Sequence, residues 1–217
     1  MKQQIVRIDR ESDCSFTSTE RDELLQSLES ALNKAHGVLI SDYGYGAVDQ
    51  ELADRLIQWA NQKGLPIVLD SRHHLLRFSG VTAATPNQQE VEESLNLRIE
   101  EEDALNQAGE LLLNRLEADA ILITRGSLGM SLFIPDSPRR DLPAYGAHEV
   151  ADVTGAGDTV VSTFTLAVSA GANFEEAATL ANYAAGIVVM KHGTATVDSS
   201  ELVEALRKRP PADDVEG

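Results

Sequence analysis

The sequence predicts an α/β fold, in which a mostly parallel β-sheet carries helices on both faces. Two observations support this. Short, almost wholly apolar runs occur at 38–40, 66–69 and 120–124, and amphipathic segments with helical spacing separate them. A run that is apolar at every position must be buried on both sides, as the strands of parallel sheets are. In such folds the functional side chains lie beyond the carboxyl ends of the strands.

The first half of the chain alternates strands with helices. In chain order we expect a strand at 4–9, a helix at 24–35, a strand at 38–40, a helix at 52–60 and a strand at 66–69. Lys63-Gly64 closes the second helix, because glycine tolerates the left-handed conformation that ends helices. The two buried strands end in Ser41-Asp42 and in Asp70, which brings polar side chains to the predicted functional edge.

The second half extends the sheet and then becomes helical. We expect a helix at 104–116, a strand at 120–124, short strands at 130–133 and 139–142, and helices at 155–170, 174–190 and 199–207. Pro135, Pro138 and Pro143 flank the two short strands. Because proline has no N–H to donate, they confine these strands to an antiparallel edge of the sheet.

Composition limits the classes of partner. The chain of 217 residues has 18 Lys and Arg against 35 Asp and Glu, which is a formal charge of −17. This balance argues against nucleic acid or an anionic membrane as the main partner, since both need a basic face. The length and the 42% hydrophobic content suit one domain. We place it at residues 1–208, followed by a polar tail at 209–217.

Cysteine content and the N-terminus indicate the compartment. Cys14 is the only cysteine, so no intrachain disulfide can form. The first residues lack the apolar stretch of a signal peptide, and no window approaches the roughly 18 apolar residues of a membrane span. We therefore expect a cytoplasmic protein.

The most informative segment is Asp152-Val153-Thr154-Gly155-Ala156-Gly157-Asp158-Thr159, which opens a long apolar helix. Its small residues leave backbone N–H groups open at a helix start, where the helix dipole favours an anion. A carboxylate beside such a site, here Asp158, suits proton abstraction from a hydroxyl. The alternative is a tight glycine turn in which Asp158 only complements the dipole.

This segment resembles the C-terminal signature of the ribokinase-like, or PfkB, sugar kinases. Four more motifs occur in that family's order and spacing: SDYGYG at 41–46, TPNQQE at 85–90, TRGSLGM at 124–130 and ANYAAGIVVMKHGTATV at 181–197. The resemblance runs from about residue 3 to about residue 205 and is strongest to heptose-7-phosphate kinases. It implies a ribokinase-like three-layer fold, with ATP as phosphate donor and a sugar or sugar phosphate as acceptor.

The resemblance also implies catalytic roles at the glycine-rich segment. Asp158 would be the general base that takes the proton of the acceptor hydroxyl. The N–H groups of Gly155, Ala156 and Gly157 would stabilise the phosphoryl group in transfer. Asp152 matches a position that in some relatives helps to bind a monovalent cation.

Asn87 and Glu90 match the family's Asn-x-x-Glu pair, in which the glutamate helps to hold Mg²⁺ near the phosphates, largely through waters. Considered without the family, the same two residues are a helix start. Asn87 would then be an N-cap and Glu90 its capping-box partner. Both interpretations stay open at the level of sequence.

The nucleotide site that the resemblance implies has three parts. They are the strand end and turn with Thr124, Gly126 and Gly129, the helix residue Asn182 near the adenine, and the following loop with His192 and Gly193. The alternatives are an ordinary hairpin at the turn and close helix packing around Asn182.

The chain departs from the family in three places. Tyr45 stands where close relatives have a lysine, and Asp70-Ser71-Arg72-His73 replaces an Asp-Pro-Lys-Gly turn. The family's N-terminal segment, with its Gly-Gly sugar-binding motif and lid, has no counterpart, so we expect an N-terminally truncated fold with an open sheet edge. Three hypotheses follow: a sugar kinase, as a homo-oligomer or with a chain that supplies this segment; a nucleotide-binding module; and a non-catalytic remnant.

Overall fold

A computed structural model of the chain describes residues 16–146 and 152–208. The strand expected at 4–9, Cys14 and the tail at 209–217 lie outside the described residues. The strands are β1 (Val38–Asp42), β2 (Ile67–Ser71), β3 (Ala83–Ala84), β4 (Ala120–Thr124), β5 (Met130–Phe133) and β6 (Arg140–Leu142). The helices are α1 (Ser18–Leu32), α2 (Gln50–Lys63), α3 (Gln88–Leu95), α4 (Glu102–Leu116), α5 (Ala156–Ser169), α6 (Phe174–Val189) and α7 (Ser199–Arg207).

The six described strands form one sheet in chain order, β1-β2-β3-β4-β5-β6. Strands β1 to β4 are parallel, and β5 and β6 are added antiparallel, as the sequence predicts. Strand β3 was not predicted from the sequence pattern, and α3 was anticipated only as a helix start at Asn87. Strand β3 has two residues, Ala83 and Ala84, and owes its place to pairing with β2 on one side and β4 on the other.

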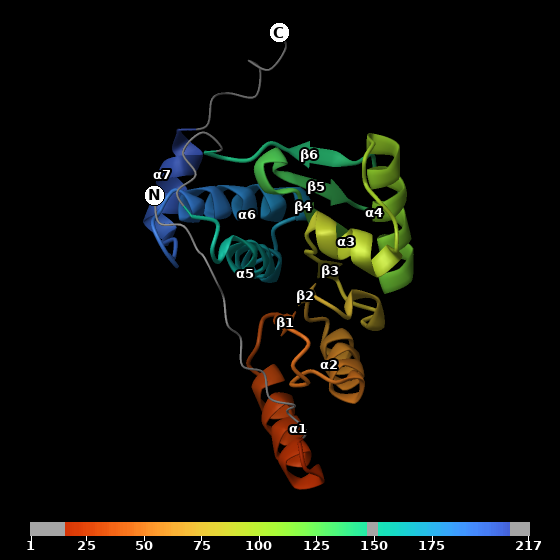
Figure 1. The fold of residues 1–217 in the computed structure, drawn as a ribbon. Helices are drawn as coiled ribbons and strands as arrows, with labels where there is room; N and C mark the ends of the chain where they lie inside the picture. The colour runs from red at the N-terminus through yellow and green to blue at the C-terminus, as the bar shows by residue number, and fades with distance from the viewer. Residues whose placement is uncertain (1–15, 147–151, 209–217) are drawn as a thin grey trace.

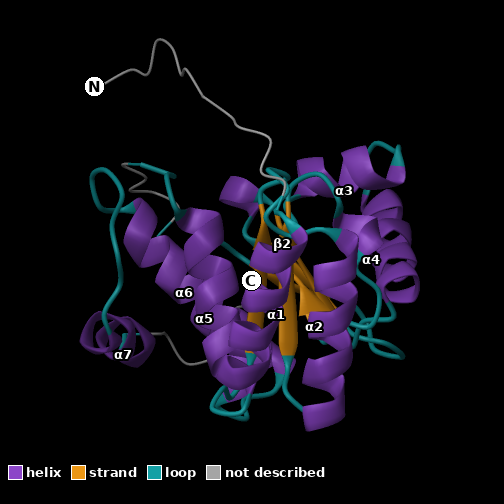
Figure 2. Ribbon diagram, turned by 90° about the horizontal axis from the view of Figure 1, so that it is seen from below, coloured by secondary structure: helices purple, strands orange, loops and turns teal. Residues whose placement is uncertain are grey.

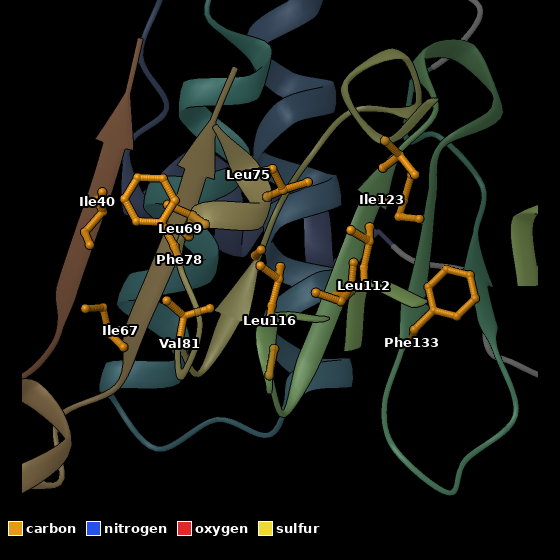
Figure 3. Close-up of a cluster of buried hydrophobic side chains, with 14 of the residues drawn as sticks. Ile40, Ile67, Leu69, Leu75, Phe78, Val81, Leu112, Leu116, Ile123 and Phe133 are labelled. Atoms are coloured by element: carbon orange, nitrogen blue, oxygen red, sulfur yellow. The ribbon is translucent and has the colours of Figure 1, made fainter. Parts of the chain in front are cut away.

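The fold has three layers, with α2, α3 and α4 on one face of the sheet and α5 and α6 on the other (Figures 1 and 2). The side chains of β2 alternate between the two cores. Ile67 and Leu69 pack with α2 and α4, whereas Val68 packs with α5 and α6. Figure 3 shows part of the first core. These strands are apolar at successive positions because both of their faces are covered.

Local sequence signals account for the helix ends. Helix α1 begins at Ser18, earlier than expected, because Thr17 and Glu20 form a capping box. Helix α2 ends at Gly64, whose φ of 64° is the left-handed conformation that glycine adopts without steric cost. The predicted closure at Lys63-Gly64 is thereby confirmed.

Strand β1 is the outermost strand of the described sheet and pairs with β2 on one side only. Helix α5 packs against both strands. Leu39 of β1 is 36% exposed and Leu166 of α5 is 71% exposed. Within residues 16–146 and 152–208, β2 is the one strand that pairs with β1. No helix among the described residues has the length and apolar character that crossing a membrane requires.

Candidate functional site

The glycine-rich segment forms the start of α5. Gly155 is the N-cap, and its φ of 82° is a conformation that favours glycine. The N–H of Ala156 donates to the carbonyl of Val153 at 3.2 Å. Within the described residues, the N–H groups of Gly157 and Asp158 donate to no backbone carbonyl. The open donors at this helix start are therefore centred on Gly157.

Gly157 is exposed and has free space in front of it. A Cβ added to Gly157 would meet no described heavy atom within 4 Å. Packing among the described residues therefore gives no reason for a glycine at this position. A ligand that approaches the backbone N–H groups closely would give one, as anions at helix starts do.

Asp158, in the first turn of α5, is in contact with the loop after β1. The hydroxyl of Tyr43 donates a hydrogen bond of 2.7 Å to Oδ1 of Asp158. Burial, with the negative charge of Asp158 nearby, raises the pKa of Asp70 to about 6. Arg72 acts in the opposite direction on Asp70. The carboxyl ends of β1 and β2 and the start of α5 thus form one charged centre.

Asn87 and Glu90 form a capping box at the start of α3. The side-chain oxygen of Asn87 accepts from the N–H of Glu90, and the carboxylate of Glu90 accepts from the N–H of Asn87, each at 2.9 Å. The helix start and the capping box that the sequence predicted are therefore confirmed. Burial, with a smaller contribution from Asp70, raises the pKa of Glu90 to about 7. A half-buried carboxylate close to a second one is a place where a cation is electrostatically favoured.

The described residues contain no cluster of three or more His, Cys, Asp or Glu side chains able to enclose a metal. Mg²⁺ fits such a sparse site, because it keeps several waters and is commonly held by one or two carboxylates plus substrate phosphates. Glu90 is the residue that would hold it here.

A cavity of about 270 Å³ joins three of the predicted site segments. It is mainly apolar and is bounded by the β4–β5 turn, by α6 and by the start of α5. The predicted residues among its walls are Thr124, Gly126, Gly129, Asn182, Ala156 and Gly157. Tyr145 and Val153 also line the cavity, and the sequence predicted no role for either. Apolar residues at a loop and a helix start carry no signal by themselves.

Asn182 contributes to the cavity through the loop after β6. Its side chain is 6% exposed and its Nδ2 donates to the carbonyl of Pro143 at 2.8 Å. One turn further on α6, a Cβ added to Gly186 would approach the carbonyl oxygen of Tyr145 to 2.3 Å. These two residues of α6 therefore let the loop at Pro143–Tyr145 lie close to the helix, where it walls the cavity.

Gly126 and Gly129 serve the turn in different ways. Gly129 has a φ of 88°, and a Cβ added to it would approach the carbonyl oxygen of Leu142 to 2.0 Å, so the fold itself requires a glycine. Gly126 has a φ of 57°, but a Cβ added to it would meet no described atom within 4 Å. Gly126 therefore lines the cavity without being required by packing.

Asp152, His192 and Gly193 come together at a second place beside α5. Asp152 accepts the N–H of Thr154 at 2.9 Å, which lowers the pKa of Asp152, and His192 and Gly193 contribute in the same direction. His192 and Gly193 are exposed and do not line the cavity. The structure therefore brings these two predicted residues to Asp152 rather than to Asn182.

Comparisons with known proteins identify the family of the chain. The profile described as "pfkB family carbohydrate kinase" matches residues 5–201. The bifunctional protein HldE of Pasteurella multocida is 41% identical over 208 residues, covering 95% of this chain and 42% of that protein. HldE of Syntrophotalea carbinolica is 38% identical over 205 residues, covering 94% of this chain and 42% of that protein.

Solved structures show the same fold. Ribokinase of Arabidopsis thaliana, in complex with ribose and ATP, superposes with a TM-score of 0.74 at 22% identity, covering 84% of this chain and 59% of that one. Phosphofructokinase-2 from Escherichia coli, in complex with potassium, has a TM-score of 0.74 at 19% identity, covering 89% and 63%. The ribokinase-like fold class is thereby confirmed.

The curated relatives are longer than the chain, which spans about 42% of their length. The family profile, in contrast, covers almost the whole chain. Because this match extends over residues 5–201, the chain belongs to the pfkB family of carbohydrate kinases.

Proposed function

We propose that this chain carries the nucleotide site and the catalytic base of an ATP-dependent sugar kinase. A single observation carries the proposal: the cavity lined by Thr124 and Asn182 opens onto the start of α5, where the N–H groups of Gly157 and Asp158 donate to no backbone carbonyl among the described residues. Transfer of a terminal phosphoryl group requires a cavity for the nucleobase, an anion site for the phosphates and a carboxylate that takes a proton. Here the three lie next to one another.

The size of the cavity suits the donor. At about 270 Å³ it lies just below the 300–1,000 Å³ range of pockets that hold whole ligands, so it suits a nucleobase with the rest of the nucleotide outside. The phosphates would then lie at the N-terminus of α5, where helix dipole and N–H groups both favour an anion. ATP with Mg²⁺ near Glu90 is the donor we propose.

The proposed reaction balances as a single phosphoryl transfer. Asp158 takes the proton of the acceptor hydroxyl while that oxygen bonds to the γ-phosphorus, and the bond between that phosphorus and the β,γ-bridging oxygen breaks to release ADP. The N–H groups near Gly157 stabilise the charge on the transferred group. Positioning and charge stabilisation supply the rate.

For the acceptor we propose a sugar or sugar phosphate, with a heptose 7-phosphate as the first compound to assay. The strong resemblance to heptose-7-phosphate kinases supports this choice, as do the HldE relatives at about 40% identity. We also propose a monovalent cation beside Asp152, supported by the lowered pKa of this carboxyl group and by the potassium complex of the phosphofructokinase-2 neighbour.

We further propose that the open edge of β1 takes part in assembly, either with a second copy or with another chain. Unpaired strand edges attract partners, and exposed Leu39 and Leu166 lie on β1 and on the helix packed against it. Light scattering tests this proposal. A species larger than the monomer that Leu166→Glu returns to monomer supports it, and a stable wild-type monomer contradicts it.

Calorimetry and thermal unfolding with Mg-ATP test the nucleotide site, because a ligand that binds the folded state raises the melting temperature. A coupled ADP assay with heptose 7-phosphate, hexoses and pentoses then tests the transfer. Binding without transfer would favour a nucleotide-binding module. Neither binding nor transfer at millimolar Mg-ATP would favour a non-catalytic remnant and contradict the proposal.

A further inference from the structure

A buried carboxylate ties together the two loops that face Asp158. Asp42, at the end of β1, is 3% exposed. Its carboxylate accepts the N–H of Gly44 at 2.9 Å and the hydroxyl of Ser71 at 2.9 Å, and it lies 3.2 Å from Nδ1 of His74. A buried carboxylate with this many partners is held firmly, because losing any one of them is costly.

The backbone of Asp42 joins the same loops. The N–H of Arg72 donates to the carbonyl oxygen of Asp42 at 3.0 Å. Gly44, with a φ of 79°, lies so close to His73 that an added Cβ would come within 2.9 Å of Cδ2 of that ring. The loop after β1 and the loop after β2 therefore pack as one unit, and this unit carries Tyr43.

Tyr43 is held at three points. Its backbone follows the anchored Asp42, the guanidinium carbon of Arg72 lies 4.6 Å from the centre of its ring, and its hydroxyl donates to Oδ1 of Asp158 at 2.7 Å. The ring of Tyr45 stacks at 6.5 Å with an interplanar angle of 9°. A guanidinium over an aromatic face is an attractive contact that limits the motion of the ring.

This arrangement determines which oxygen of the base is free. A carboxylate has two oxygens, and a hydrogen bond to Oδ1 fixes the rotation of the group and leaves Oδ2 for an acceptor hydroxyl. A catalytic group held in its working geometry loses less freedom on the way to the transition state. The hydrogen bond from Tyr43 therefore orients Asp158. None of the roles proposed above for the site residues includes this contact.

We propose that Tyr43 is a positioning residue for Asp158, presented by the loop pair that Asp42 ties together and held in place by Arg72. Its hydroxyl fixes the carboxylate through Oδ1 so that Oδ2 faces the acceptor. This inference rests on the proposed role of Asp158 as the base. It adds to that site a residue from the loop after β1.

The hydrogen bond can be tested without any enzymatic activity. The chain has four tyrosines, which can be replaced by 3-fluorotyrosine and followed by ¹⁹F NMR while the pH is raised. Tyr43→Phe and Tyr45→Phe assign the two resonances. Tyr43 faces Asp158, Arg72 and Asp70, and the hydrogen bond to Asp158 is the largest of the influences that raise its pKa. The fluorophenol at 43 should therefore titrate at higher pH than free 3-fluorotyrosine.

Asp158→Asn removes the charge and keeps the size of the side chain. In this variant the titration midpoint of Tyr43 should fall toward that of free 3-fluorotyrosine, and Asp42→Asn should shift it in the same direction by loosening the loop pair. A Tyr43 resonance that titrates like free 3-fluorotyrosine in the wild type, or whose titration midpoint does not change in Asp158→Asn, overturns the proposal.

The kinetic arm uses Tyr43→Phe, which keeps the ring and its contact with Arg72 and removes only the hydroxyl. We expect kcat to fall about 10- to 100-fold, the scale that small misplacements of reacting groups produce, with KM for ATP unchanged. Tyr183→Phe, a buried tyrosine of α6, is the matched control and should keep the wild-type kcat. Full kcat in Tyr43→Phe overturns the positioning role. If the wild type transfers no phosphate, the proposed function fails, while the NMR titration still decides the contact.

Discussion

Asn87 and Thr124 lie side by side at the carboxyl edge of the sheet, joined by a parallel bridge. The N–H of Thr124 donates to the carbonyl of Pro86 at 2.9 Å. One residue belongs to the predicted magnesium pair and the other to the predicted nucleotide turn. Their contact places the capping box of α3 against the end of β4, so the cation and the nucleotide would share one edge.

The role of Asp158 predicts a specific kinetic change. Asp158→Asn should lower kcat by about 100-fold or more and leave Mg-ATP affinity nearly unchanged, because the amide cannot accept the proton but leaves the N–H groups of α5 in place. A coupled ADP assay and calorimetry measure the two quantities. Asp22→Asn, on the exposed face of α1, is the control. Wild-type kcat in Asp158→Asn would show that this residue only complements the helix dipole.

The space in front of Gly157 predicts a loss of binding without a loss of folding. A Cβ meets nothing within 4 Å, so Gly157→Val should fold, yet its side chain would cover the N–H groups and reduce Mg-ATP binding by at least about tenfold. Circular dichroism checks the fold and calorimetry the binding. Undiminished affinity in Gly157→Val would contradict an anion site there.

The two turn glycines should differ in stability. Gly129→Ala drives a methyl group to 2.0 Å from a backbone oxygen and should cost more than about 3 kcal/mol of unfolding free energy. Gly126→Ala meets only the left-handed backbone and should cost about 1–2 kcal/mol. Urea unfolding measures both. Equal losses would mean that the turn is not packed against Leu142 as described.

The raised pKa of Asp70 predicts a stability that depends on pH. Its pKa is about 6 in the folded chain against an ordinary 3.8, so ionising Asp70 in the folded state costs free energy. Stability should fall as pH rises from about 4 to above 6. Asp70→Asn removes this cost and should stabilise the chain at pH 8 by about 1–2 kcal/mol, allowing for partial exposure, and very little at pH 4. Urea unfolding at both pH values decides. A gain that is equal at the two pH values would point to packing instead.

Most local elements could be predicted from the amino-acid sequence. The apolar runs of β1, β2 and β4, the helical spacing of α2 and α4 and the glycine at 64 all appear as predicted, because each depends on residues within one or two turns of each other. The capping box at Asn87 was visible for the same reason. The family motifs predicted the start of α5 and the turn after β4, because each of these segments is recognisable from a few consecutive residues.

The contacts between these segments could not be predicted from the sequence, because they arise from the packing of whole elements. Strand β3 forms by pairing with β2 on one side and with β4 on the other. Its two residues are too few to show a strand pattern in the sequence. The contact of Tyr43 with Asp158 and the raised pKa of Asp70 depend on loops from separate strands that converge at one sheet edge. Periodicity reports which face of an element is buried, whereas such contacts depend on how whole elements pack, and burial raises a pKa only after they have packed.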